Sequence, residues 1–191
     1  MVGSRRGRDD WTAIALVALA EGGLAAVAVE PLAARAGATK GSLYWHFPTR
    51  DALVEATLLR WEREHAGAVI EFAERGADPG ERLRLLFEAV WRPESAPEVE
   101  LALLASAGEP LVAAVLARVG ERRVDYLAAQ YGLLGFTRAQ SRRRALTAYS
   151  IYLGQGQLHR AAPELVPRSA AARRAHVADV LRVLLVDPVE H

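Results

Sequence analysis

Apolar residues recur at intervals of three and four along almost the whole chain, and no stretch alternates apolar and polar residues for long. The first spacing gathers apolar side chains on one face of an α-helix, whereas alternation is typical of a β-strand. Alanine, leucine and arginine, which favour helices, dominate the sequence. Glycines and prolines divide the pattern into about nine segments. The sequence therefore predicts an all-α protein of about nine helices.

Four helices are expected in the N-terminal part and five in the rest. The first begins after Asp10, a suitable N-cap residue, and the next three span about 29–36, 39–47 and 50–75. The later helices are expected at about 81–91, 98–106, 111–131, 137–159 and 169–186. The boundary between a compact N-terminal module and the remainder falls inside the fourth helix, so a rigid segment joins the two parts.

The charges of the chain nearly cancel: 24 Lys and Arg residues face 23 Asp and Glu residues, which leaves a formal net charge of +1. This balance argues against a protein that coats nucleic acid regardless of sequence, because such binding scales with the number of phosphates neutralised. It leaves room for a small basic patch. Lys40 is the only lysine. The absence of cysteine excludes disulfides, thiolate zinc sites and iron–sulfur clusters.

The first thirty residues imitate a secretory signal, with arginines, an apolar run from Trp11 to Ala20, and then small residues. However, Asp9 and Asp10 stand where a signal carries positive charge, and Glu21 ends the run. No uninterrupted apolar stretch reaches the ~18 residues that a membrane span requires. We therefore expect a cytoplasmic protein without a signal peptide.

Residues 29–47 have the pattern of a helix-turn-helix: an apolar helix, a glycine turn and a short second helix that ends at Pro48. In this motif the second helix enters the major groove of DNA. The first turn of the short helix carries Thr39, Lys40 and Ser42. Free backbone amides and the positive end of the helix dipole favour phosphate at such a turn.

The short helix is expected to have an inner and an outer face. Leu43 and Phe47, four residues apart, can anchor the inner face, which leaves Lys40, Tyr44 and Trp45 pointing outward. A helix that served only the core would not carry this set of polar and aromatic side chains.

This segment, GATKGSLYWHFPTRDALVEA, resembles the signature of the TetR-family repressors, AGVSxGxLYxHFxxKxxL. The resemblance extends over about residues 10–61, and the later helices agree only in number and length. It implies an all-helical homodimer. It further implies a helix-turn-helix DNA-binding domain at residues 8–60, with the motif at about 28–47, and an effector-binding and dimerisation domain at 61–191.

The resemblance also implies which side chains contact DNA. Thr39 and Lys40 would contact base edges or phosphates, Tyr44 and His46 phosphates, and Arg50 the DNA backbone. Glycine permits close approach of the backbone. The full candidate set is Thr39, Lys40, Gly41, Ser42, Tyr44, Trp45, His46 and Arg50.

The chain departs from the family pattern at two positions. Ala28 stands where the family usually has a capping Ser or Thr, and Arg50 replaces the more frequent lysine. Losing a cap costs about 1 kcal/mol.

Each candidate also has a purely structural interpretation. Lys40 could be an ordinary surface lysine. Tyr44 and Trp45 could be core aromatics, with Trp45 packed against the next helix, and His46 could make a hydrogen bond within the module. Phe47 is expected in the core.

The C-terminal part offers a less specific pattern. Aromatic and polar residues spread over its helices could line a mostly apolar ligand cavity. Taken singly, each is better explained as plain core than as pocket, and only the resemblance implies an effector. The candidate ligand-binding residues are Trp61, His65, Phe87, Trp91, Tyr126, Tyr149 and Tyr152.

The last two expected helices have small or aliphatic faces that contain Ala145, Ala148, Val177 and Leu181. These faces either pair with a second copy of the chain or close the core of the monomer. We favour the dimer, mainly because reading a two-fold DNA site requires one.

The sequence thus favours a ligand-responsive transcriptional regulator, a repressor. It would bind a pseudo-palindromic operator as a homodimer and be released by a small, mostly apolar effector. The alternatives are a helical interaction or scaffold protein without DNA binding, and a helical metal enzyme. Glu62 and His65 have the E-x-x-H spacing of di-iron bundles, but such sites need a second pair, which we do not find. We expect no enzymatic activity, cofactor or metal.

Overall fold

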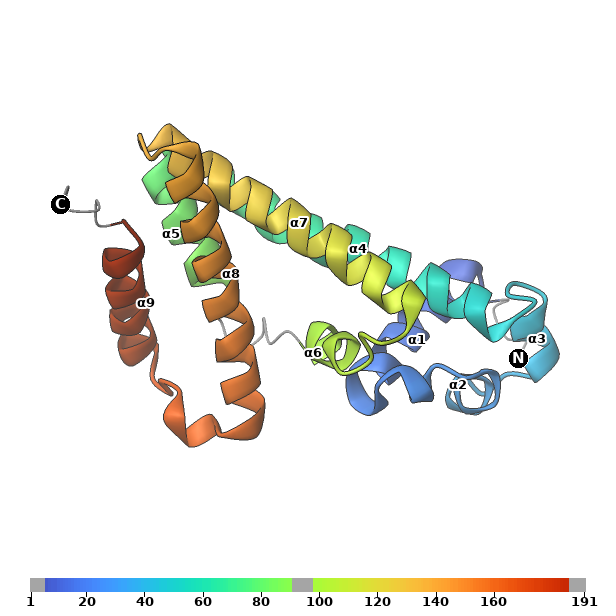
Figure 1. Cartoon of the computed structure of the whole chain (residues 1–191). Helices are drawn as coiled ribbons and strands as arrows, with labels where there is room; N and C mark the ends of the chain where they lie inside the picture. The colour runs from blue at the N-terminus through green and yellow to red at the C-terminus, as the bar shows by residue number, and fades with distance from the viewer. Residues whose placement is uncertain (1–5, 91–97, 186–191) are drawn as a thin grey trace. The chain divides into compact units, whose positions relative to one another are not determined.

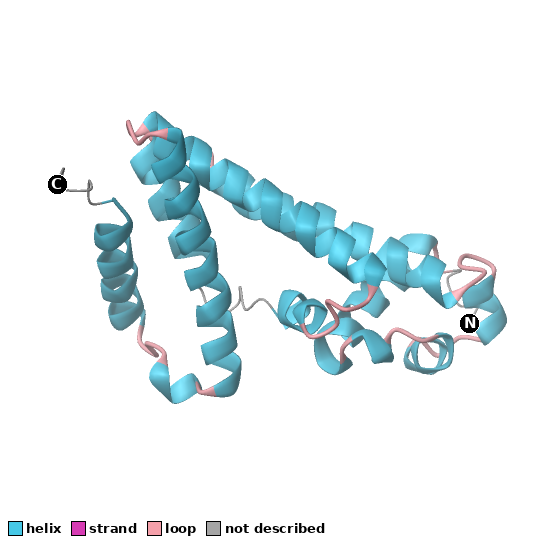
Figure 2. Cartoon of the chain, in the orientation of Figure 1, coloured by secondary structure: helices cyan, strands magenta, loops and turns pink. Residues whose placement is uncertain are grey.

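A computed structural model describes residues 6–90 and 98–185, without the side chains of residues 65, 66 and 90. All regular structure in these ranges is helical, which confirms the all-α prediction (Figures 1 and 2). There are nine α-helices here, as predicted, and two short 3-10 helices, η1 (Leu24–Ala26) and η3 (Pro163–Leu165). The α-helices are α1 (Arg8–Gly22), α2 (Val29–Arg35), α3 (Lys40–Tyr44), α4 (Arg50–Ala73), α5 (Pro79–Val90), α6 (Glu98–Leu104), α7 (Pro110–Leu133), α8 (Arg138–Ala161) and α9 (Ala170–Leu185).

The described residues form two compact units. The first contains the residues up to Glu64 and Glu98–Arg118, and the second contains the remainder. The sequence-based division at residue 60 assigned α6 and the start of α7 to the C-terminal domain. In the structure α6 belongs with α1, against which it packs.

The first helix begins two residues before Asp10, so the prediction that Asp10 is its N-cap was wrong. Gly7 is the N-cap, and the Asp10 carboxylate accepts a hydrogen bond from the Gly7 backbone N–H at 2.8 Å. Asp10 thus satisfies a backbone donor from within the first turn, where the helix dipole also favours its negative charge.

The first unit is held together by apolar side chains from all of its N-terminal helices. Trp11 and Leu19 of α1, Leu43 of α3 and Leu53 of α4 are fully buried. Thr39 caps the start of α3. Pro48 follows soon after the end of the helix. A proline disfavours the helical conformation of the residue before it, so the helix cannot continue far. The short third helix therefore ends at Tyr44, three residues earlier than predicted.

Helices α5, α8 and α9 and the C-terminal part of α7 build the core of the second unit. Ala145 and Ala148 of α8 and Val177 and Leu181 of α9 are buried in this core. These faces close the monomer core, so the expectation that they form the dimer interface was wrong. The apolar residues that α8 and α9 expose are different ones, including Leu146 and Val183.

Helices with the length and apolarity to cross a membrane are absent from the part of the chain that the structure describes.

Candidate functional site

Helix α3 separates buried from exposed side chains as its sequence predicts. The Thr39 hydroxyl accepts a hydrogen bond from the Ser42 backbone N–H at 3.3 Å, which fixes the first turn. Leu43 and Phe47 have no exposed surface, and the prediction that Phe47 belongs to the core is confirmed. The anchored inner side keeps the opposite side of the short helix facing solvent.

The two aromatic residues after Leu43 lie outside the core. Tyr44 is 50% exposed and Trp45 is 77% exposed. The alternative interpretation of these residues as core aromatics was therefore wrong. Exposed aromatic rings carry a cost in water that ordinary surface residues do not, which makes this face a candidate for contact with another molecule.

Lys40 is exposed, but it is not a solitary surface charge. Its ammonium group forms an ion pair with the carboxylate of Glu30, which lies on α2. No sequence pattern indicated Glu30 as the partner of Lys40. The two residues lie on different helices, and the i,i+4 rule that identifies pairs along one helix does not apply across a turn.

His46 makes the intramodular hydrogen bond that one interpretation expected. Its Nε2 lies 3.0 Å from the backbone carbonyl of Arg6. Arg8 donates to the His46 carbonyl at 2.9 Å, and its guanidinium carbon lies 4.3 Å from the centroid of the Phe47 ring. These contacts attach the residues before and within the first turn of α1 to the end of the helix-turn-helix.

Arg50 binds carbonyl groups of its own chain. Its Nε donates to the Val27 carbonyl at 2.9 Å and its Nη2 to the Leu24 carbonyl at 2.8 Å. A guanidinium can satisfy two separated acceptors at once, which the single ammonium of a lysine does less well. The arginine thus supports the segment before α2, where Ala28 provides no side-chain cap.

Gly41 is exposed on α3. An added Cβ would meet only the Thr39 hydroxyl, at 3.9 Å, an ordinary contact. Packing within the described chain therefore does not require glycine here. Close approach of another molecule to α3 would explain a glycine at this position.

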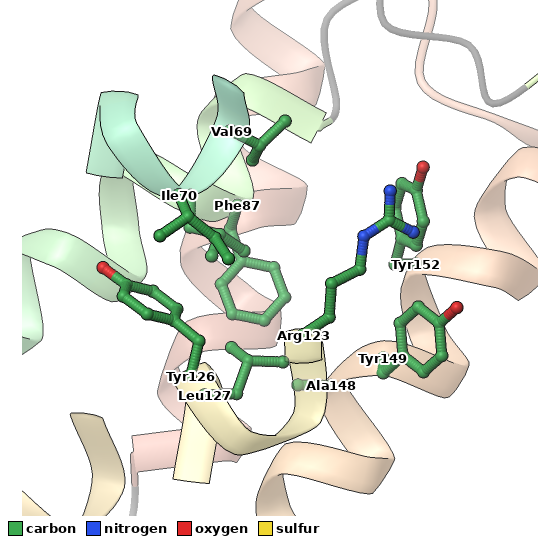
Figure 3. Close-up of a pocket in the computed structure, with 10 residues that line it drawn as sticks. Val69, Ile70, Phe87, Arg123, Tyr126, Leu127, Ala148, Tyr149 and Tyr152 are labelled. Carbon is green, nitrogen blue, oxygen red and sulfur yellow. The ribbon is translucent and has the colours of Figure 1, made fainter. Parts of the chain in front are cut away.

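A cavity of about 50 Å³ lies in the second unit (Figure 3). Four of the seven candidate ligand-binding residues line it: Phe87, Tyr126, Tyr149 and Tyr152. Trp61 is 2% exposed and lies in the first unit. The His65 side chain and Trp91 lie outside the described residues.

Six further residues line the cavity: Val69, Ile70, Leu86, Arg123, Leu127 and Ala148. The aliphatic residues among them lack the aromatic or polar character by which the candidate ligand-binding residues were predicted from the sequence. Arg123 resembled any other arginine of an arginine-rich chain, and only its position in the fold distinguishes it.

Arg123 lies against two tyrosine rings on α8. The rings of Tyr149 and Tyr152 are stacked, with centroids 6.1 Å apart and an angle of 19° between their planes. The guanidinium carbon of Arg123 lies 5.9 Å from the first centroid and 5.4 Å from the second. Elsewhere in the lining, burial raises the pKa of the Tyr126 phenol well above its usual range, and the nearby Glu74 carboxylate acts in the same direction.

Glu62, the first residue of the E-x-x-H pattern, forms an ion pair within the chain. The Glu62 carboxylate pairs with the Arg118 guanidinium, at 2.7 Å to Nη2 and 3.1 Å to Nε. Among the described residues, no group of three His, Asp or Glu side chains could hold a metal ion.

A family model described as bacterial regulatory proteins, tetR family, matches residues 13–57. The match contains α2, α3 and the exposed residues of α3. No curated protein sequence matches the chain.

Solved structures share the fold over nearly the whole chain. A transcriptional regulator from Rhodococcus sp. Rha1 is 22% identical, with a TM-score of 0.78, and the match covers 96% of this chain and 100% of that one. A Rhodococcus sp. protein described as a TetR-family transcriptional regulator is 23% identical, with a TM-score of 0.72 and coverage of 94% and 98%. A transcriptional regulator from Saccharomonospora viridis, solved in complex with choline, is 18% identical, with a TM-score of 0.78 and coverage of 92% and 95%.

At these identities the likeness establishes the fold, whereas the family-model match establishes the nature of the N-terminal domain. The N-terminal helix-turn-helix part of the chain thus matches the TetR family of bacterial regulatory proteins, and the chain as a whole shares the fold of solved transcriptional regulators.

Proposed function

We propose that the chain represses transcription by binding a pseudo-palindromic operator as a homodimer and that a small effector releases it. The observation that carries the DNA-binding part is the exposed face of α3. Lys40, Tyr44 and Trp45 face solvent there, while Leu43 and Phe47 anchor the opposite side. A cation and aromatic rings on a short helix after a tight turn suit contact with phosphates and base edges.

The charge of the DNA-binding module favours a dimer. Residues 1–50 contain six Lys and Arg residues and four Asp and Glu residues, a net charge of +2. A single module with so weak a field would bind DNA feebly, so two modules on one operator would be needed for useful affinity. The exposed Leu146 on α8 and Val183 on α9 are the apolar residues that a second copy of the chain would cover.

The cavity in the second unit is the proposed effector site. The regulator from Saccharomonospora viridis that shares this fold was solved with choline, which supports a small-molecule ligand for this architecture. Helix α4 begins at Arg50, in the helix-turn-helix module, and carries Val69 and Ile70 of the cavity lining. A ligand that displaced this helix would alter the DNA-binding module, and a coupling of about 1–3 kcal/mol would suffice.

Fluorescence anisotropy with the promoter next to the protein's own gene tests the DNA-binding part. We expect tight binding to this duplex, weak binding to an unrelated duplex, and affinity that falls with added salt. Lys40→Ala should abolish the specific binding. Arg63→Ala, which removes an exposed cation of α4 outside the helix-turn-helix, should leave it nearly unchanged.

Equal, weak binding to every duplex would refute the proposal that the chain is a DNA-binding regulator. It would favour an interaction protein that uses the same exposed aromatic residues. The effector-release part fails separately if every ligand that binds the chain leaves operator affinity unchanged.

A further inference from the structure

The helix-turn-helix module contains one cation that the module itself does not use. Residues 1–50 carry six Lys and Arg residues, and five of them lie in the described part of the chain. Four of the five have partners within the chain: Arg8 with the His46 carbonyl, Arg35 with Glu21, Lys40 with Glu30, and Arg50 with the Leu24 and Val27 carbonyls. The fifth is Arg6, whose guanidinium makes no ion pair or hydrogen bond with the described residues.

The backbone of Arg6 is nevertheless held in place. Its carbonyl oxygen lies 3.0 Å from Nε2 of His46, in a partly buried contact. His46 directly follows the exposed Trp45, so this contact places Arg6 beside the end of the proposed DNA-binding face. The next residue, Gly7, is the N-cap of α1 and donates to the Asp10 carboxylate. A partly exposed, uncommitted guanidinium thus starts from a fixed point next to α3.

The same contact limits what His46 can do itself. A carbonyl oxygen only accepts hydrogen bonds, so Nε2 of His46 carries the hydrogen and donates it to Arg6. A neutral imidazole has a single N–H donor. While this bond exists, the neutral ring therefore has no donor left for the phosphate that the family resemblance assigns to His46. A nearby group with free donors would have to bind that phosphate instead.

We infer that Arg6 binds a DNA phosphate beside the α3 contact and that His46 is the residue that positions Arg6. Hydrogen bonds between a guanidinium and a phosphate are charge-assisted, and such bonds are stronger than neutral ones. A free cation also matters more in a module whose net charge is only +2. The inference rests on the proposed function in one respect, that the chain binds an operator through α3.

Fluorescence anisotropy with the full chain and the promoter duplex tests the contact. Arg6→Ala should weaken operator binding about three- to tenfold and reduce the slope of log affinity against log salt by about 0.9, the effect of one phosphate contact. Phosphates carry no sequence information, so the loss should be the same when the base pairs flanking the operator are changed. Arg63→Ala removes an exposed cation of α4 and should change neither affinity nor slope.

A double-mutant cycle tests the positioning role. His46→Ala removes the ring donor but keeps the backbone carbonyl that accepts from Arg8. It should weaken operator binding about as much as Arg6→Ala, and the double variant should bind no more weakly than either single variant, because both act on one contact. His46→Gln, whose amide can donate to the same carbonyl, should recover most of the affinity.

Wild-type affinity or an unchanged salt slope in folded Arg6→Ala would overturn the phosphate contact. A loss that depends on the flanking base pairs would overturn it as well, because it would indicate a contact with base edges. Additive losses in the double variant would overturn the positioning role and make His46 a direct contact. Circular dichroism verifies folding, and His46→Asn, whose shorter amide does not reach the position of Nε2, replaces His46→Ala in the cycle if the latter does not fold.

Failure of this inference is distinguishable from failure of the proposed function. A wild-type chain that binds every duplex equally refutes the proposed function. A wild-type chain that binds its operator specifically, and loses this binding in Lys40→Ala but not in Arg6→Ala, refutes only the role of Arg6.

Discussion

Glu30 on α2 and Lys40 on α3 form an ion pair that joins the two helices of the helix-turn-helix. The carboxylate thus neutralises the cation that the proposed operator contact needs. Glu30→Gln removes this negative charge, so we expect operator affinity to rise about two- to tenfold and to become more salt-dependent, as for a protein that neutralises up to one more phosphate. Anisotropy titrations over a range of salt concentrations measure both quantities.

Glu21→Gln is the matched control for this prediction. Glu21 pairs with Arg35 in the same unit, and both side chains are exposed. Its loss should leave operator affinity nearly unchanged, because this pair lies outside the exposed face of α3. Unchanged or weaker binding of the Glu30→Gln variant would show that the carboxylate serves to orient Lys40 instead.

Lys40→Arg should change which operator bases are preferred and also lower affinity. Lysine offers a compact charge on a flexible stem, whereas the arginine fork favours bidentate contact with guanine. The Glu30 carboxylate can pair with either residue, so the variant should keep its stability. Selection from a randomised operator library compares the preferences of variant and wild type. Identical preferences would mean that the charge of Lys40 acts on phosphates alone.

Substitution of Phe47 should affect the stability of the fold, whereas substitution of Trp45 should affect operator binding. Trp45 is 77% exposed and Phe47 is fully buried, although they are only two positions apart in the sequence. Phe47→Ala should lower the free energy of unfolding by about 3–5 kcal/mol, because it empties a packed core position. Trp45→Ala should change it by less than about 0.5 kcal/mol, as exposed substitutions do. The same Trp45 variant should bind the operator more weakly.

Chemical denaturation measures both stabilities, and anisotropy measures the operator affinity of the Trp45 variant. If folded Trp45→Ala bound the operator with wild-type affinity, the exposed ring would not be part of the proposed interface. A large loss of stability in that variant would contradict its exposure.

Local pattern was enough to predict the helices and the two faces of α3. Leu43 and Phe47 lie four residues apart, and their burial by itself directs Tyr44 outward. The prediction was wrong where it depended on a competing local partner. Asp10 has the chemistry of an N-cap, but its carboxylate reaches back to Gly7 and the helix begins earlier.

Contacts between segments far apart in the chain could not be predicted from the sequence. The guanidinium of Arg50 binds a carbonyl 26 residues earlier, at Leu24, and Arg123 meets rings on another helix. No spacing rule along one helix reports such pairs, because they depend on how the helices pack. The same limit explains why the small faces of α8 and α9 suggested a dimer, whereas they close the core of one chain.

The hydroxyl of Tyr131 is buried without a hydrogen-bond partner among the described residues. Its ring meets that of Phe136 edge to face, with centroids 5.8 Å apart. Tyr131→Phe keeps this ring contact and removes the unsatisfied group, so we expect the free energy of unfolding at pH 7 to rise by about 1 kcal/mol. Thermal and urea denaturation measure the change. A loss of stability would mean that the hydroxyl has a partner.

Burial also raises the pKa of Tyr131 to about 12, from a usual value near 10. Below pH 10 the phenol is protonated in both the folded and the unfolded chain, so stability does not depend on it. Between pH 10 and 12 the unfolded phenol loses its proton first, which favours unfolding and lowers stability by about 2–3 kcal/mol. Tyr131→Phe should therefore lose less stability than the wild type over this interval. Tyr44→Phe, which alters an exposed tyrosine, should follow the wild-type curve. Identical alkaline curves for wild type and Tyr131→Phe would show that the phenol ionises as easily in the folded chain as in the unfolded one.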